Sequence, residues 1–144
     1  MGQKKDSEIL ILNLTVKNQY IEIERVNSEF NAFARTYGLS DSIRRKVNLV
    51  FDELLNNIIS YAFQDEEEHH INIQVELSVS RLCITISDDG IPFNIFELPP
   101  SPTDLKLEDR PIGGMGIHLV RGMMDNYSYR LENGKNITIL IKYI

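Results

Sequence analysis

The sequence predicts a two-layer α+β sandwich, in which three helices cover one face of a mixed, mostly antiparallel sheet. Two observations lead to this prediction. Segments with apolar residues every three or four positions, the period of a helix face, are interleaved with segments of alternating apolar and polar residues, the period of a strand. Several strands are neighbours in sequence and should pair antiparallel, which argues against a doubly wound parallel sheet.

The first half of the chain is expected to hold a strand over residues 8–16 and two helices. The first helix starts near Gln19 and ends at Gly38, a residue type that often follows a helix end. The second is capped by Ser40 or Asp41. Their apolar faces comprise Ile23, Val26, Phe30, Phe33 and Tyr37 in the first helix, and Ile43, Val47, Val50, Leu54, Ile58 and Tyr61 in the second.

The second half is expected to hold two antiparallel hairpins and a third helix. The strands are 71–79 and 82–86, joined across Ser80-Arg81, and 127–132 and 136–144, joined across Asn133-Gly134. Asn-Gly is a strong hairpin turn. The third helix follows Gly113 and Gly114 and runs to about Asp125. All five prolines lie within 92–111, and a loop of this length inside a compact domain is usually functional.

Composition narrows the classes of partner. A net charge of −6 gives no electrostatic basis for binding nucleic acid. No apolar run approaches the roughly 18–20 residues that span a bilayer, and the N-terminus lacks the apolar core of a secretory signal. The single cysteine, Cys83, allows no disulfide framework. We therefore expect one cytoplasmic domain over residues 1–144.

The first chemically suggestive segment lies on the second helix. Glu53 and Asn57 are four residues apart, so they lie on the same helix face, at the edge of the apolar stripe. A carboxylate and an amide at this position would face the crevice above the helix, where a cation that prefers oxygen ligands could bind. A hydrogen-bonded pair on the helix edge is the alternative.

The other two segments follow a strand and precede a helix. Asp88 stands at the end of an apolar strand, where its carboxylate could accept a hydrogen bond from an exocyclic amine such as that of adenine. Gly90 would allow the backbone to approach a ring closely or to take a positive φ, although a plain Asp-Gly turn is the alternative. Gly113, Gly114 and Gly116 open the third helix and expose backbone N–H groups at its positive end, which favours phosphate binding.

In this order and spacing, the three segments resemble the N box, G1 box and G2 box of the GHKL ATP-binding fold, also called the Bergerat fold. The proline-rich stretch resembles its ATP lid, here about 94–112. The resemblance runs from about Ile9 to Ile144. Asp88-x-Gly90-x-Pro92-Phe93, together with residues 110–125, is similar to one branch, the anti-sigma-factor serine kinases.

The resemblance implies ATP and Mg²⁺ as cofactors and a role for each matching residue. Glu53 would be the catalytic base for the attacking hydroxyl, Asn57 would bind Mg²⁺, and Asp88 would bind the adenine amine. The other implied nucleotide contacts are Gly90, Pro92, Gly113, Gly114, Gly116 and Thr138. We add Arg110 from its place at the lid base, where it would neutralise the γ-phosphate. Arg25 matches a partner-contacting arginine of the family.

The implied function is an ATP-dependent protein-serine kinase of a bacterial partner-switching system. It would phosphorylate a STAS-type antagonist of an anti-sigma factor and, in its other state, sequester a sigma factor or similar regulator. A PP2C-type phosphatase would act in the same pathway; a homodimer is compatible with the resemblance, and no nucleic-acid or membrane partner is implied. The alternative is a binding module whose nucleotide state selects its protein partner, with little or no phosphotransfer.

The chain departs from the family pattern at two places. Tyr61 stands near where many relatives have histidine. Asn136-Ile137-Thr138 stands where relatives carry Gly-Thr-Thr, so only the second threonine is kept. A detached histidine-kinase catalytic domain is disfavoured, because Pro92 replaces the glycine usual in those kinases.

Overall fold

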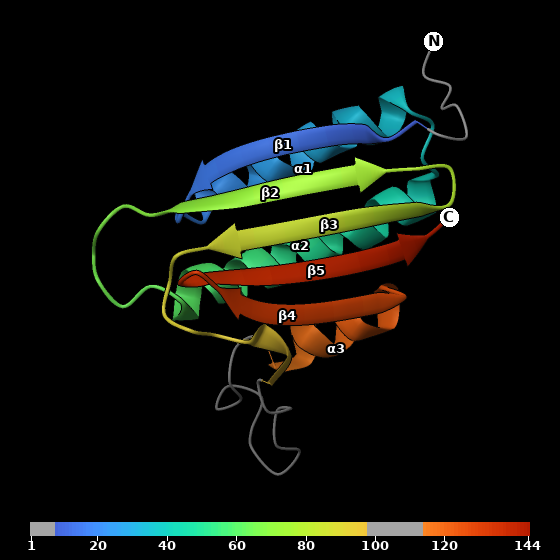
Figure 1. Ribbon diagram of the computed structural model, residues 1–144. Helices are drawn as coiled ribbons and strands as arrows, with labels where there is room; N and C mark the ends of the chain where they lie inside the picture. The colour runs from blue at the N-terminus through green and yellow to red at the C-terminus, as the bar shows by residue number, and fades with distance from the viewer. Residues whose placement is uncertain (1–7, 98–113) are drawn as a thin grey trace.

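A computed structural model describes residues 8–97 and 114–144. Its five strands form one sheet in the order β1-β2-β3-β5-β4, and the helices cover one face of it (Figure 1). The elements are β1 Leu10–Lys17, α1 Ile21–Thr36, α2 Asp41–Tyr61, β2 His70–Leu77, β3 Arg81–Asp88, the short 3-10 helix η1 Ile95–Glu97, α3 Gly114–Met123, β4 Asn126–Glu132 and β5 Lys135–Tyr143. The predicted two-layer α+β fold is confirmed.

The sheet differs from the expectation in one respect: all four strand pairings in the described residues are antiparallel, so the sheet is not mixed. Two helices connect β1 to β2 and return the chain to the end at which β1 finished, which makes this pair antiparallel. The connection through α3 links β3 to β4, which lies two positions away from β3 in the sheet. Because β5 then inserts between them, β3 and β4 run in the same direction without pairing.

The predicted ends of both long helices and the Asn133-Gly134 turn agree with the structure, whereas the turn expected at Ser80-Arg81 lies at residues 78–80 and Arg81 begins β3. Ser40 caps α2, since its hydroxyl oxygen accepts a hydrogen bond from the backbone N–H of Ile43 at 3.2 Å. Gly38 follows the C-cap of α1 and has a φ of 75°, in the left-handed region that favours glycine. Asn133 and Gly134, with φ of 53° and 76°, form the two-residue turn between β4 and β5. Val79, expected at the end of a strand, instead lies exposed in the turn after β2.

The core lies between the sheet and the helices. Alternate residues of β3 and β5 face it, and at one end of the sheet, where β3 finishes and β5 begins, the buried positions are polar instead of apolar. There the buried side chains are Asp88 on β3, and Asn136 and Thr138 on β5. Burying polar groups is costly unless they are hydrogen-bonded, so this end of the core must contain an organised polar cluster.

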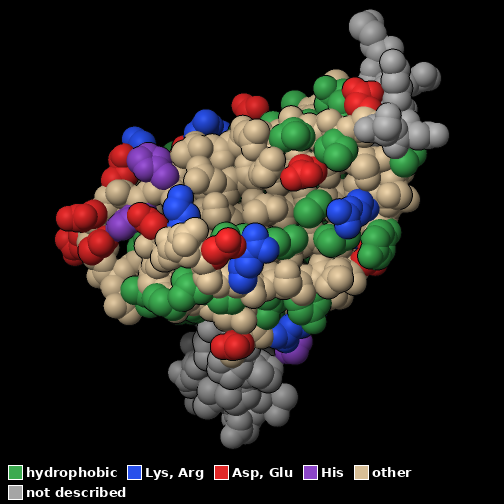
Figure 2. Space-filling view, in the orientation of Figure 1, with side chains coloured by type: hydrophobic (Ala, Val, Ile, Leu, Met, Phe, Trp, Pro, Cys, Tyr) green, Lys and Arg blue, Asp and Glu red, His purple; other side chains and the backbone are tan. Residues whose placement is uncertain are grey.

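No helix of residues 8–97 and 114–144 covers the opposite face of the sheet, and on it hydrophobic side chains are interspersed with polar and charged ones (Figure 2). No helix in the described part of the chain combines the length and apolar character required to cross a bilayer.

Of the lid expected over about 94–112, the first residues form η1, whose Ile95 is buried and whose first turn is closed by the Asn94 side chain. The rest of that stretch, from 98, falls outside the described residues up to 113.

Candidate nucleotide-binding site

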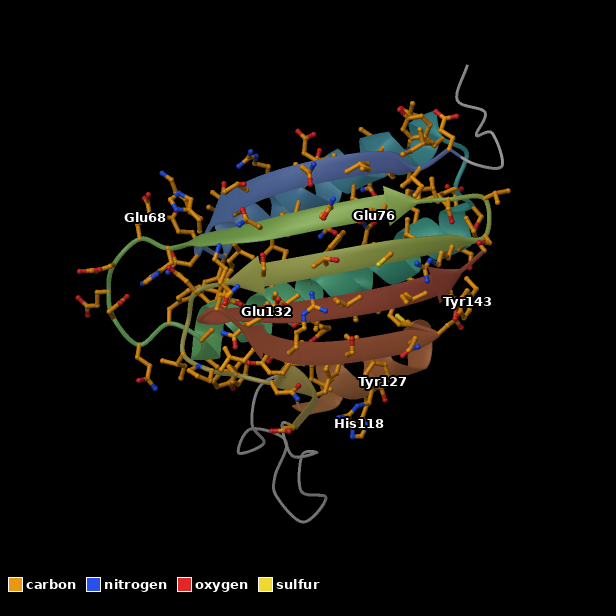
Figure 3. The ribbon with its side chains drawn as sticks, in the orientation of Figure 1. Glu68, Glu76, His118, Tyr127, Glu132 and Tyr143 are labelled. Atoms are coloured by element: carbon orange, nitrogen blue, oxygen red, sulfur yellow. The ribbon has the colours of Figure 1, made fainter. Side chains whose placement is uncertain are left out.

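The predicted site residues that the structure describes come from the second half of α2, the end of β3, the turn that follows β3, the first half of β5 and the first turn of α3. In Figure 3, the labelled side chains of Glu68 and Glu132 mark the end of the sheet at which β3 finishes and β5 begins, and Tyr143 marks the opposite end. His118, the lone histidine of α3, is exposed and projects away from the sheet (Figure 3).

Asp88 is a buried carboxylate, with 4% of its surface exposed. Its Oδ1 accepts hydrogen bonds from the backbone N–H of Gly90 at 2.8 Å and from Nδ2 of Asn136 at 3.0 Å. Burial raises the pKa of Asp88, while these two donors oppose that shift. Asp88 therefore does close an Asp-Gly turn, but it is also a buried acceptor of the kind that a nucleobase amine requires.

Gly90 is needed for close packing and not for a left-handed conformation. A β-carbon at this position would lie 2.5 Å from the carbonyl oxygen of Ala62 and 2.8 Å from its Cβ. The next residue, Ile91, donates its N–H to the same carbonyl at 2.8 Å. Whereas the sequence had suggested an approach to a ring, the close approach that the structure shows is therefore to the end of α2. It fixes the turn after β3 against that helix, and the Tyr61 and Phe93 rings, 5.8 Å apart, pack across the same junction.

Glu53 and Asn57 form the helix pair that the sequence predicted. Asn57 is 2% exposed, and its Nδ2 donates to the backbone carbonyl of Glu53 at 2.8 Å. Its amide nitrogen is therefore used within the helix, and Oδ1 is the atom suited to ligating a cation such as Mg²⁺. Burial, and secondarily the neighbouring Asp52, raises the pKa of the Glu53 carboxyl.

The glycine segment contacts this pair. A β-carbon on Gly116 would lie 1.8 Å from Oε2 of Glu53, so the first turn of α3 packs directly on the carboxylate. Gly114 is the first residue of α3, where backbone N–H groups have no partner within the helix. Gly113 and Arg110 lie outside the described residues.

The remaining predicted residues occupy different environments. Thr138 is buried on β5, two residues from Asn136 on the same face. Pro92 is exposed in the turn after β3. Arg25 is on α1, where it forms an ion pair with Glu22 at 3.2 Å.

Sequence reasoning missed the role of Asn136, which it treated only as a departure from a family pattern. The structure pairs Asn136 with Asp88 across β5 and β3 and buries both side chains. No local signal identified it, because the apolar residues that alternate along β5, Ile137, Ile139 and Ile141, are on the face opposite to Asn136.

The open antiparallel sheet, the helix pair Glu53 and Asn57, the buried Asp88 and the glycine-rich start of α3 together define the class of Bergerat-type ATP-binding domains. More specifically, the chain belongs to the histidine kinase-like ATPase domain family, whose model matches residues 16–142.

Curated relatives of the chain are named as protein kinases. The chain is similar to the serine-protein kinase RsbW of Listeria innocua, with 24% identity over 139 residues, covering 94% of this chain and 87% of the relative. Its similarity to RsbW of Bacillus mycoides is 26% over 141 residues, covering 95% and 86%. A serine/threonine-protein kinase of Bordetella bronchiseptica, BtrW, is 30% identical over 97 residues, covering 67% and 68%.

Proposed function

We propose that this protein is an ATP-dependent protein-serine kinase of a bacterial partner-switching system. It phosphorylates a STAS-type antagonist protein and, in its other state, sequesters a sigma factor or similar regulator. The family and the kinase names of its relatives support the general class. The proposal of phosphotransfer depends on one observation within this chain: the half-buried carboxylate of Glu53 lies against the first turn of α3, where phosphates would bind.

In this reaction Glu53 accepts the proton of the substrate serine hydroxyl, and the serine oxygen attacks the γ-phosphorus of ATP. The bond from that phosphorus to the bridging oxygen breaks, and ADP leaves. Catalysis of this type is mainly positioning and electrostatic stabilisation. The raised pKa of Glu53 makes it a better proton acceptor than an exposed carboxylate would be.

The remaining groups hold the nucleotide. Asn57 would ligate Mg²⁺ through Oδ1, and a bound Mg²⁺ would neutralise phosphate charge. The backbone N–H groups of Gly113, Gly114 and Gly116, with Arg110, would bind the phosphates. Asp88 would accept a hydrogen bond from the adenine amine, with Gly90, Pro92 and Thr138 shaping that end of the site. Arg25 on α1 is half exposed and is the proposed contact to a protein partner.

The direct test is incubation of the purified chain with Mg²⁺ and γ-labelled ATP, together with candidate STAS-domain proteins. Transfer of label to a serine of one candidate, dependent on Mg²⁺, is the expected result. ATP binding that changes the affinity for a candidate without transfer of label would favour the alternative, a nucleotide-controlled binding module. The proposal is wrong if calorimetry detects no binding of ATP.

A further inference from the structure

The Asn136 side chain lies at the centre of the polar cluster beside Asp88, and it is 2% exposed. Its Nδ2 donates to Oδ1 of Asp88 at 3.0 Å, to the carbonyl of Ile91 at 2.8 Å and, less closely, to that of Gly90 at 3.3 Å. Its Oδ1 accepts from the backbone N–H of Phe93 at 3.0 Å and from the hydroxyl of Tyr129.

This pattern fixes the orientation of the amide. The nitrogen faces one carboxylate and two carbonyls, all of which can only accept, and the oxygen faces an N–H and an O–H group, both of which can donate. A flipped amide would place its oxygen against three acceptors. Asn136 thus connects β4, β5 and the end of β3 to the turn over residues 90–93.

The contact also divides the two oxygens of Asp88 between different tasks. Within residues 8–97 and 114–144, the hydrogen bonds to its carboxylate, from Gly90 and Asn136, both end on Oδ1. Oδ2 is then the oxygen that can accept a hydrogen bond from a ligand. With Oδ1 held by two donors and the following turn held by the same amide, the direction of Oδ2 is fixed before a ligand arrives, which lowers the entropic cost of binding.

We propose that Asn136 is a positioning residue that sets the base selectivity of the nucleotide site: by fixing the Asp88 carboxylate and the 90–93 turn, it allows Oδ2 to recognise a 6-amino purine. This inference rests on the proposed nucleotide-binding function. Its distinguishing consequence is that Asn136 affects the preference for a 6-amino over a 6-oxo purine, not only the affinity for nucleotide as a whole.

The test compares calorimetric binding of Mg²⁺-ATP and Mg²⁺-ITP, which carries an oxygen in place of the adenine amine. We expect the wild type to prefer ATP by about 10- to 100-fold, the value of one hydrogen bond to a charged group. In Asn136→Ala, ATP binding should weaken and ITP binding change little, so that the preference falls several-fold. Asn136→Asp is nearly isosteric but places an acceptor against Asp88, and it should lose the preference as well.

Tyr129→Phe is the matched control, because it removes one donor to Asn136 and leaves the contact to Asp88 in place. It should keep most of the preference for ATP. Hydrogen exchange of the nucleotide-free protein provides a local check: the Phe93 amide, which donates to Asn136 at 3.0 Å and less closely to the Tyr129 hydroxyl at 3.3 Å, should exchange faster in Asn136→Ala. The Ile91 amide, bonded to Ala62, should be unchanged if the variant is folded.

The outcomes separate this inference from the proposed function. Equal weakening of ATP and ITP in a folded Asn136→Ala variant would show a merely structural residue and overturn the inference. Tighter ATP binding in that variant would also overturn it, since Asn136 would then obstruct the base. A wild type that binds neither nucleotide would instead refute the proposed function.

Discussion

Gly116 of α3 and Glu53 of α2 are in such close contact that a β-carbon at position 116 would lie 1.8 Å from Oε2 of Glu53. Sequence reasoning assigned this glycine to phosphate binding. The structure adds a second requirement, because any side chain here would displace the carboxylate that we propose as the catalytic base.

Gly116→Ala should therefore impair phosphotransfer without weakening the fold. Alanine is favoured over glycine in a helix by about 1 kcal/mol, so the melting temperature should not fall. Displacing the carboxylate should lower the phosphotransfer rate at saturating ATP by about 10- to 100-fold, part of the 10²–10⁴-fold that a base supplies. Gly122→Ala in the same helix is the control, since nothing lies within 4 Å of its β-carbon. Equal phosphotransfer rates of Gly116→Ala and Gly122→Ala would contradict the expected displacement of the Glu53 carboxylate.

Glu53→Gln should abolish phosphotransfer while leaving ATP binding largely intact. The amide keeps the size of the side chain but cannot accept the serine proton, so the expected loss is about 10²–10⁴-fold in rate. Single-turnover transfer of labelled phosphate, paired with calorimetry of ATP, measures both effects. Asp52→Asn is the comparison. Oδ1 of Asp52 accepts a hydrogen bond from Nδ2 of Asn27 on α1 at 2.7 Å, and the Asp52→Asn variant should remain active. A fully active Glu53→Gln variant would exclude Glu53 from the chemistry.

Asp88→Asn should weaken ATP binding by about 10- to 100-fold, because a hydrogen bond to a charged acceptor is lost. The exposed neighbour provides a control, and Asp89→Asn should change ATP affinity far less. An unchanged affinity of Asp88→Asn by calorimetry would refute the assignment of Asp88 to the adenine amine.

The same variant should be more stable than the wild type when no nucleotide is bound. Burial raises the pKa of Asp88 in the folded state, so ionised Asp88 costs stability as the pH rises through that pKa. The gain in the unfolding free energy of Asp88→Asn should be full above the raised pKa and shrink as the pH falls through it towards the unfolded value. Urea denaturation over a pH series measures it, and a gain that does not vary with pH would contradict a raised pKa.

His69 should stabilise the protein mainly at acidic pH. Its ring nitrogens contact Asp65 at 2.6 Å and Asp89 at 3.1 Å, and these hydrogen bonds, chiefly that with Asp65, raise the pKa of His69. Its contribution is complete below the unfolded pKa of about 6.5 and is lost as the pH rises through the higher folded value. The difference in unfolding free energy between wild type and His69→Gln should thus shrink from pH 5 to pH 9. A difference that stays constant over this pH range would contradict a raised pKa of His69.

Much of the fold followed from local patterns in the sequence. The period of apolar residues predicted the positions of both long helices and all five strands, and the capping residue Ser40 and the turn at Asn133-Gly134 were identified from residue type. The pairing of Glu53 with Asn57 was also predictable, because a spacing of four residues fixes a shared helix face. The mixed sheet was not confirmed, since strand direction alone does not determine which strands are neighbours.

By itself, then, the sequence determined the features that depend on neighbouring residues: element type, helix ends, turns and the acidic-amide pair on α2. Only the tertiary structure decided how the site is assembled. Asn136 reaches Asp88 across a separation of 48 residues because β5 inserts beside β3, and Gly116 meets Glu53 because α3 packs on α2. Such contacts depend on which surfaces pack against each other when the whole core is buried, and this information is not contained in the periodicity of any one segment.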